Sequence, residues 1–163
     1  MRFSILVLVV LFFSLISCQN KAVYEEFKPL SINGWDLHDT LDFKFEVKDI
    51  TKKYNLYIDI RHRDLFEYQN FYIKTFTQFP SGQIKEDVLS IPLSDESGEW
   101  LGKCTGDVCF YRAPIISRFK FNDIGTYHIR IKHEMRVNDL ENLMDMGLKL
   151  EEAPKIKIEK EEI

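Results

Sequence analysis

Strict alternation of apolar and polar side chains is the feature that most constrains how this chain folds. Residues 41–47 read LDFKFEV, with an apolar side chain at every odd position. Residues 127–133, YHIRIKH, repeat the alternation. Because successive side chains of a β-strand point to opposite faces, a period of two residues predicts strands that bury one face.

The same reasoning predicts about seven or eight short strands with turn residues between them. The further predicted strands cover residues 56–60, 71–79, 83–93, 109–111, 115–121 and 147–150. One short helical turn is predicted within residues 138–144. The pattern favours an all-β fold over residues 31–152, an antiparallel β-sandwich of the jelly-roll or immunoglobulin-like kind, with a β-barrel as the alternative.

The first residues have the features of an export signal. Arg2 precedes an apolar run over 5–16 that is interrupted only by Ser14. The run is shorter than the roughly 18–20 residues of a membrane span, and it is typical of a signal peptide. Ser17 then precedes Cys18 in the sequence LISC, which resembles a bacterial lipobox.

We therefore expect residues 1–17 to be a lipoprotein signal peptide and Cys18 to carry diacylglycerol and a further acyl chain such as palmitate. Several acyl chains on one residue anchor strongly, since each buried CH₂ contributes about 0.8 kcal/mol. An ordinary cleaved secretory signal and an uncleaved N-terminal anchor are the alternatives. Gln19 in place of an aspartate weakly favours the outer membrane, and the periplasmic or surface face stays open.

Two flanking segments are predicted to lie outside the sandwich. Residues 18–30 begin with polar residues and contain Pro29, which favours a lipidated tether. Residues 153–163 read APKIKIEKEEI and are predicted to be a charged C-terminal tail.

Composition excludes several classes of partner. The formal net charge is −4, so the chain lacks the basic surface of a nucleic-acid-binding protein and of one that docks electrostatically on anionic lipid. We expect contact with the membrane only through the lipid on Cys18. Thirteen Phe and seven Tyr against seven Gly also suit β-structure.

Cys104 and Cys109 stand close together in the stretch KCTGDVC. An exported protein lies in an oxidising compartment, so this remaining pair suggests a disulfide. Two free thiols, or half of a metal site, are the alternatives. No His or further Cys lies nearby in the sequence to complete a zinc site.

A search for catalytic chemistry finds no supporting motif. The sequence has no glycine-rich phosphate loop, GxSxG, HExxH or CxxC. His128 and His133 are five residues apart on one predicted strand, so they point to opposite faces and cannot share a metal. Asp59 and Glu46 are expected to be ordinary surface charges. We expect no enzyme activity, cofactor, metal or small-molecule substrate, and a hydrolase is the least favoured hypothesis.

Three aromatic residues suggest roles that depend on their burial. Trp35 in NGWDLHD and Trp100 in GEWLGK stand in loop-like contexts. An exposed Trp can stack on a sugar or anchor a partner protein; alternatively, each caps one end of the core. Tyr127 follows a turn glycine, which is typical of a structural tyrosine corner.

An ordered set of stretches resembles one known family. Besides the lipobox cysteine, the stretches are VYEEFKPL (23–30), NGWDLHDTLDFKFEV (33–47), YNLYIDIRH (54–62), FPSG (79–82), GEWLGKCTGD (98–107), GTYHIRIKHEMR (125–136) and DMGLKLE (145–151). In this order they resemble the GldH family of gliding-motility lipoproteins of the Bacteroidota. The pair Cys104 and Cys109 departs from the family pattern, so a disulfide would not be a family trait.

The resemblance implies a lipoprotein of the cell envelope that supports gliding motility and the linked type IX secretion system. It implies a non-enzymatic component in the outer membrane that contacts other gliding or secretion proteins, and it carries over no catalytic residue. The alternative function is a carbohydrate-binding envelope lipoprotein that uses exposed Trp35 and Trp100.

Overall fold

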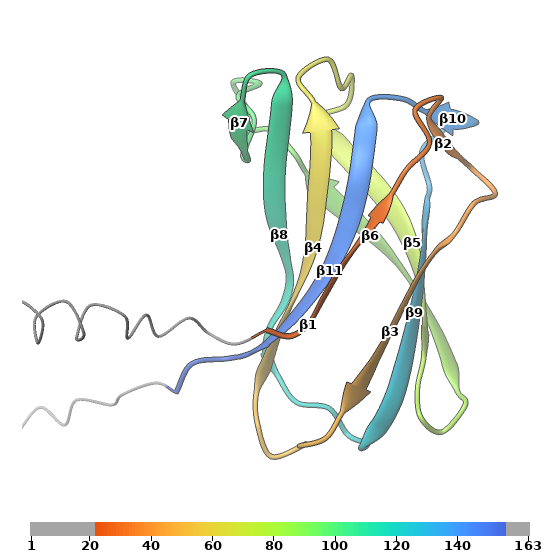
Figure 1. Ribbon diagram of the computed structural model, residues 1–163, viewed down its shortest axis with the longest axis vertical. Coiled ribbons are helices and arrows are strands. Elements are labelled where there is room, and N and C mark those ends of the chain that lie inside the picture. Colours follow the sequence, from red (N-terminus) through yellow and green to blue (C-terminus); the bar gives the residue numbers. More distant parts are fainter. Residues whose placement is uncertain (1–21, 156–163) are drawn as a thin grey trace, which may run out of the picture.

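The computed structural model describes residues 22–155, which form a two-layered β-sandwich with no helix in this part of the chain (Figure 1). The larger sheet has the strand order β1-β11-β4-β8-β7, the smaller has β3-β9-β5-β6, and β2 and β10 form a short ribbon. Every paired strand is antiparallel. The predicted all-β sandwich is thus confirmed.

Seven of the described strands overlap ranges that the alternation predicts, namely β3, β4, β5, β6, β8, β9 and β11, and β8 joins two of those ranges. The strands β1, β2, β7 and β10 were not predicted. Their bounds are β1 Ala22–Pro29, β2 Trp35–Asp36, β3 Leu41–Val47, β4 Tyr54–Arg63, β5 Asn70–Gln78, β6 Ile84–Pro92, β7 Lys103–Thr105, β8 Val108–Phe119, β9 Gly125–His133, β10 Asp139–Leu140 and β11 Leu143–Glu152.

The alternation on β3 and β9 buries one face of each strand. Phe43, Phe45 and Val47 of β3 are buried, and the residues between them are exposed. Phe45 lies opposite Tyr127 of β9, and their rings stack with centroids 5.8 Å apart. The larger sheet contributes a facing layer in which Ile60 of β4 is fully buried. Burying each such side chain stabilises the fold by about 1.5–3 kcal/mol.

The predicted helical turn within 138–144 is wrong. Asp139 and Leu140 form β10 and pair with β2, where Leu140 lies opposite Trp35. Asn142 then has a φ of 64°, which a helix does not allow, and β11 begins at the next residue. Leu140 is fully buried, so pairing with β2 and core packing outweigh the local helical pattern.

The predicted tether is wrong for residues 22–29, which form β1. This edge strand pairs with β11 along its length, with Phe27 opposite Gly147. Tyr24 also packs on Phe45 of the smaller sheet, at a centroid distance of 5.4 Å. The predicted signal peptide (1–17), Cys18 and the tail beyond residue 155 lie outside the described residues.

The two ends of the sandwich differ in what they carry. Ala22 of β1 lies opposite Glu151 of β11, so the chain enters and leaves the sandwich at one end, here called the terminal end. The loops 30–34, 64–69 and 93–102 and the β7–β8 hairpin lie at the opposite end, here called the distal end (Figure 1). No helix among residues 22–155 is long and apolar enough to cross a membrane.

Candidate functional site at the distal end

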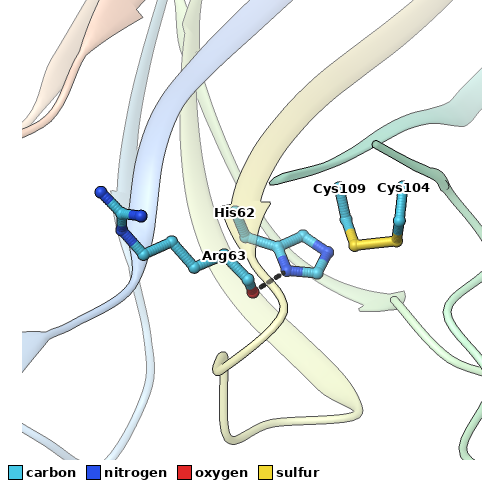
Figure 2. Close-up of a disulfide and its surroundings, with 4 residues drawn as sticks. All are labelled: His62, Arg63, Cys104 and Cys109. Carbon is cyan, nitrogen blue, oxygen red and sulfur yellow. Dashed lines mark hydrogen bonds between the residues drawn. A yellow bond between two sulfur atoms is a disulfide. The ribbon is translucent and has the colours of Figure 1, made fainter. Parts of the chain in front are cut away.

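A disulfide closes the β7–β8 hairpin at the distal end. Cys104 and Cys109 lie directly opposite each other, with their Cα atoms 3.9 Å apart, and their sulfur atoms are bonded (Figure 2). Gly106 in the turn has a φ of 62°, which glycine adopts without a steric penalty. Cys109 is fully buried, whereas Cys104 lies on the exposed strand β7. The two sulfurs therefore differ in how readily a reagent reaches them.

His62 lies beside this disulfide, because it is the partner of Cys109 in the register of β4 and β8. The imidazole is fully buried, and its Nδ1–H donates a 2.7 Å hydrogen bond to the carbonyl oxygen of Arg63. Nε2 has no hydrogen-bond partner. Burial lowers the pKa of His62 below its usual value, which keeps the ring neutral.

Trp100 covers His62 from the loop between β6 and β7. The two rings meet edge to face with centroids 4.6 Å apart. Leu101 N–H donates a 2.8 Å hydrogen bond to Leu93 O, and a Cβ on Gly102 would lie 2.5 Å from the carbonyl oxygen of Phe110. The loop is therefore pressed against β8, and Trp100 is left half-buried at the surface. A contact between Trp100 and a partner or glycan stays a prediction.

The expectation that Trp35 contacts a partner or glycan is wrong. Only 2% of Trp35 is exposed, and its Nε1–H donates a 3.2 Å hydrogen bond to Asp39 O. The indole packs on Phe71 and His133, with centroid distances of 6.3 and 5.5 Å. Trp35 is therefore part of the core near the distal end, which was the alternative left open by the sequence.

Large apolar side chains are exposed on three distal loops. Ile32 is 94% exposed, Leu65 is 71% exposed and Leu101 is 46% exposed. A hollow of about 210 Å³ lies beside Ile32 and is also lined by Arg63 and Asn142. Other apolar side chains are exposed elsewhere on the domain, among them Val88 of β6 and Ile124 at the terminal end. The three distal loops are therefore one candidate interaction surface, set apart by its place opposite the terminal end.

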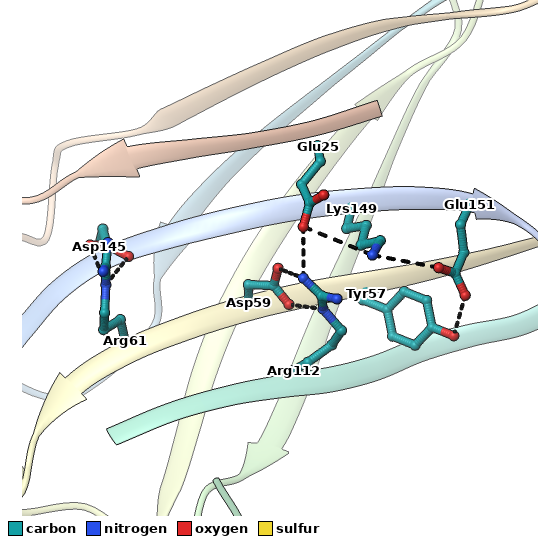
Figure 3. Close-up of polar contacts among 8 residues, drawn as sticks. All are labelled: Glu25, Tyr57, Asp59, Arg61, Arg112, Asp145, Lys149 and Glu151. Carbon is teal, nitrogen blue, oxygen red and sulfur yellow. Dashed lines mark hydrogen bonds and ion pairs between the residues drawn. The ribbon is translucent and has the colours of Figure 1, made fainter. Parts of the chain in front are cut away.

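A cluster of charged side chains on the outer face of the larger sheet holds neighbouring strands together. Asp59 of β4 was expected at the surface but is fully buried, because Arg112 of β8 covers its carboxylate (Figure 3). Glu25 of β1 pairs with the same guanidinium at 2.7 Å. Glu46, by contrast, is exposed as expected. Lys149 of β11 also lies 3.9 Å from Glu25. Sequence reasoning missed the cluster because its members come from four different strands.

Two hollows lie between β6 and β8, and the residues that line them form no arrangement of catalytic groups. The two adjoining hollows of about 250 and 200 Å³ share Leu56, Ile116 and Ile129 in their linings. Their charged lining residues include Lys85 and Asp87, which pair with each other at 2.9 Å. Within residues 22–155 no group of three His, Cys, Asp or Glu side chains is placed to hold a metal ion.

The two histidines of β9 lie on opposite faces of their strand, as predicted. His133 is fully buried, while His128 contacts Asp42 at 2.7 Å on the outer face.

A family model described as GldH lipoprotein matches residues 22–150 of this chain. The chain belongs to the GldH lipoprotein family. The matched segment begins at the first residue of β1 and ends within β11, so it coincides with the sandwich.

Relatives of this GldH-family chain match it over most of their length. It is 31% identical over 158 residues to a gliding motility lipoprotein GldH homolog of Christiangramia forsetii, and the aligned region covers 93% of this chain and 96% of the relative. It is 28% identical over 149 residues to the gliding motility lipoprotein GldH of Flavobacterium johnsoniae, and the aligned region covers 85% of this chain and 89% of the relative. Among solved structures, it is similar to a family GH115 4-O-methyl-α-glucuronidase with a TM-score of 0.47 and 13% identity, covering 85% of this chain and 18% of that chain.

Proposed function

We propose that this GldH-family chain is an outer-membrane lipoprotein, anchored through Cys18, that supports gliding motility and the linked type IX secretion as a non-enzymatic component. Its distal end would bind other proteins of the cell envelope. The lipobox-like sequence before Cys18 and the family membership support the anchor and the process. The exposed apolar residues of the distal loops support protein contact.

The separation of the two ends is the observation that carries this proposal. Residues 19–21 lie between Cys18 and the start of β1, and three residues span at most roughly 10 Å. A lipid on Cys18 would therefore hold the terminal end close to the bilayer. β11 has ten residues and rises roughly 33 Å toward the other end of the sandwich. The distal end would thus face away from the membrane, where a partner can reach it.

Carbohydrate binding is the second candidate, and it rests on Trp100 alone because Trp35 is buried. A single half-buried indole offers less stacking surface than the paired aromatic residues that this alternative assumed. Protein contact is therefore favoured. A glycan array probed with the full chain tests the alternative, and binding that disappears in Trp100→Ala would establish it.

The anchor is tested by replacing Cys18. Cys18→Ala should abolish fatty-acid labelling, leave the precursor uncleaved and impair gliding or secretion. If fatty-acid labelling persists in this variant, the lipid is attached elsewhere and the proposed orientation is wrong.

The binding surface is tested by placing a charge at either end of the sandwich. Leu65→Asp at the distal end should impair gliding or secretion and reduce crosslinking to other envelope proteins in intact cells. Ile124→Asp is the matched control, because Ile124 is a 60% exposed apolar loop residue at the terminal end. Immunoblotting should find both variants at the wild-type level. If Ile124→Asp impairs gliding or secretion and Leu65→Asp does not, the proposed surface is wrong.

A further inference from the structure

Three neighbouring strands place one histidine and two cysteines in a row at the distal end. His62 of β4 is the register partner of Cys109 of β8, and Cys109 is the register partner of Cys104 of β7. Figure 2 shows the Nε2 edge of the imidazole turned toward the disulfide. A buried base therefore lies next to the buried sulfur of a disulfide whose other sulfur belongs to an exposed strand.

The tautomer of His62 makes it suited to accept a proton on this side. Nδ1 carries hydrogen, because it donates to the carbonyl oxygen of Arg63 at 2.7 Å. In the neutral ring, Nε2 then carries a lone pair and no hydrogen. No donor among the described residues reaches this fully buried atom. Buried polar atoms without a partner are uncommon in folded proteins, so each calls for an explanation, and a redox or catalytic role is one such explanation.

We propose that Cys104, Cys109 and His62 form a thiol–disulfide exchange site that reacts with a dithiol or disulfide redox partner of the cell envelope. Cys104 is the sulfur that forms the mixed disulfide, because β7 is exposed along its length. Cys109 is the resolving sulfur, and His62 is its base. The inference rests on these three side chains and is independent of the proposed partner surface and of the lipid on Cys18.

Closure of the disulfide proceeds in two balanced steps. The thiolate of Cys104 attacks an oxidised partner disulfide, forms a mixed disulfide and releases one partner thiolate. His62 Nε2 then accepts the proton of the Cys109 thiol, and the resulting thiolate attacks the sulfur of Cys104 and releases the second partner thiolate. The two released thiolates take up two protons, the one that Cys104 lost on forming its thiolate and the one that His62 accepted from Cys109. One partner disulfide is thus reduced to two thiols while the two thiols of the protein are oxidised to a disulfide. Reduction follows the same path in reverse.

Opening the disulfide changes the distal surface. β7 pairs with β8 over only three residue pairs, and all three of its side chains are exposed, so the disulfide is its main attachment. The loop that precedes β7 carries Trp100, which lies on His62. Reduction should therefore loosen β7 and move Trp100 off the imidazole. The exchange site would thus set the shape of the surface that carries Leu101.

The test uses the full chain extracted from membranes in detergent. Dithiothreitol should reduce the Cys104–Cys109 disulfide without unfolding the protein, as followed by circular dichroism. Glutathione disulfide is then added to the reduced protein, and samples quenched with iodoacetamide are mapped by mass spectrometry. Glutathione should appear transiently on Cys104 and then disappear as the disulfide closes.

His62→Phe removes the base while keeping a planar ring of similar size. It should slow the closing step about tenfold or more and make the Cys104 adduct accumulate, without slowing its formation. His133→Phe is the matched control, because His133 is also fully buried with an unpartnered Nε2 but lies on β9. It should leave both steps unchanged.

Three outcomes would overturn the proposal: reduction only on unfolding, glutathione found first on Cys109, or equal closing rates in His62→Phe and wild type. The first two are measured on the wild-type chain, so the test stands even if His62→Phe fails to fold.

Discussion

Asp59 is fully buried beneath Arg112, which donates one 2.7 Å hydrogen bond from Nε and another from Nη2 to its two carboxylate oxygens. The same Nη2 also contacts Glu25 of β1 at 2.7 Å. Asp59 raises the pKa of Arg112 through this paired hydrogen bond and charge attraction. One side chain of β8 therefore links the centre of the larger sheet to its edge strand.

Arg112→Leu should lower the free energy of unfolding by about 3–5 kcal/mol, because it leaves the charge of Asp59 buried without a partner. Urea unfolding of the variant and of wild type measures the difference. Lys48→Leu is the control, since Lys48 and Glu46 form an exposed pair that contributes at most about 1 kcal/mol. The double variant Asp59→Leu/Arg112→Leu should recover most of the loss. If Arg112→Leu costs no more than Lys48→Leu, the buried pair has no special role.

Gly147 makes room for β1 to lie against β11. A Cβ at this position would lie 2.9 Å from two ring carbons of Phe27 and 3.1 Å from the Cβ of Asp59. Gly147→Val should therefore displace the Phe27 ring and cost about 1–3 kcal/mol of stability. Hydrogen exchange should show reduced protection of the β1 amides.

The double variant Phe27→Ala/Gly147→Val tests the cause of that loss. Removing the ring should restore part of the β1 protection, because the steric conflict with Phe27 is then absent. Equal exchange of the β1 amides in Gly147→Val and wild type would instead mean that β1 is held without this contact.

The alternation of apolar residues was sufficient to predict most of the sandwich. On β3 and β9 the buried residues fall on alternate positions, as packing on a single core requires, and all of them except His133 are apolar. β1 was missed because Glu25 and Glu26 interrupt the alternation in a strand at the sheet edge. The pairing of such a strand depends on its neighbour, here on Gly147 of β11, and local sequence does not reveal that neighbour.

The distal cluster was only partly predictable for the same physical reason. Cys104 and Cys109 are close in sequence, so their proximity could be expected. His62 is distant from both in the sequence and lies beside Cys109 only through the register of β4 and β8. The sequence also left open whether each tryptophan is exposed, and the two differ in this respect. Trp35 is enclosed by the pairing of β2 with β10, whereas Trp100 is half-buried on its loop.

Tyr127 forms the tyrosine corner that the sequence predicted. Its hydroxyl donates a 3.0 Å hydrogen bond to the backbone oxygen of Asp123, four residues earlier, and the ring is buried. Tyr127→Phe should therefore lower the free energy of unfolding by about 1 kcal/mol and leave the circular dichroism spectrum unchanged. Tyr54→Phe is a comparison variant, because its hydroxyl also donates to a backbone oxygen, that of Asp49. No change in either variant would mean that water replaces these hydrogen bonds at no cost.

Burial lowers the pKa of both His62 and His133 in the folded protein. In the unfolded chain a histidine has a pKa of about 6.5, so below this pH the unfolded state binds protons that the folded state does not. The free energy of unfolding should thus be fully retained above pH ~6.5 and fall as the pH drops toward the lower pKa of the folded state. Each histidine contributes at most about 1.4 kcal/mol per pH unit.

Urea unfolding at a series of pH values between about 5 and 8 measures this slope. His62→Phe and His133→Phe should each make the slope shallower by the contribution of one proton, and the double variant should show the sum of the two effects. The carboxylates titrate mainly at lower pH, so they contribute little in this range. A slope in the double variant equal to that of wild type would show that the two buried rings take up protons in the folded state as readily as in the unfolded chain.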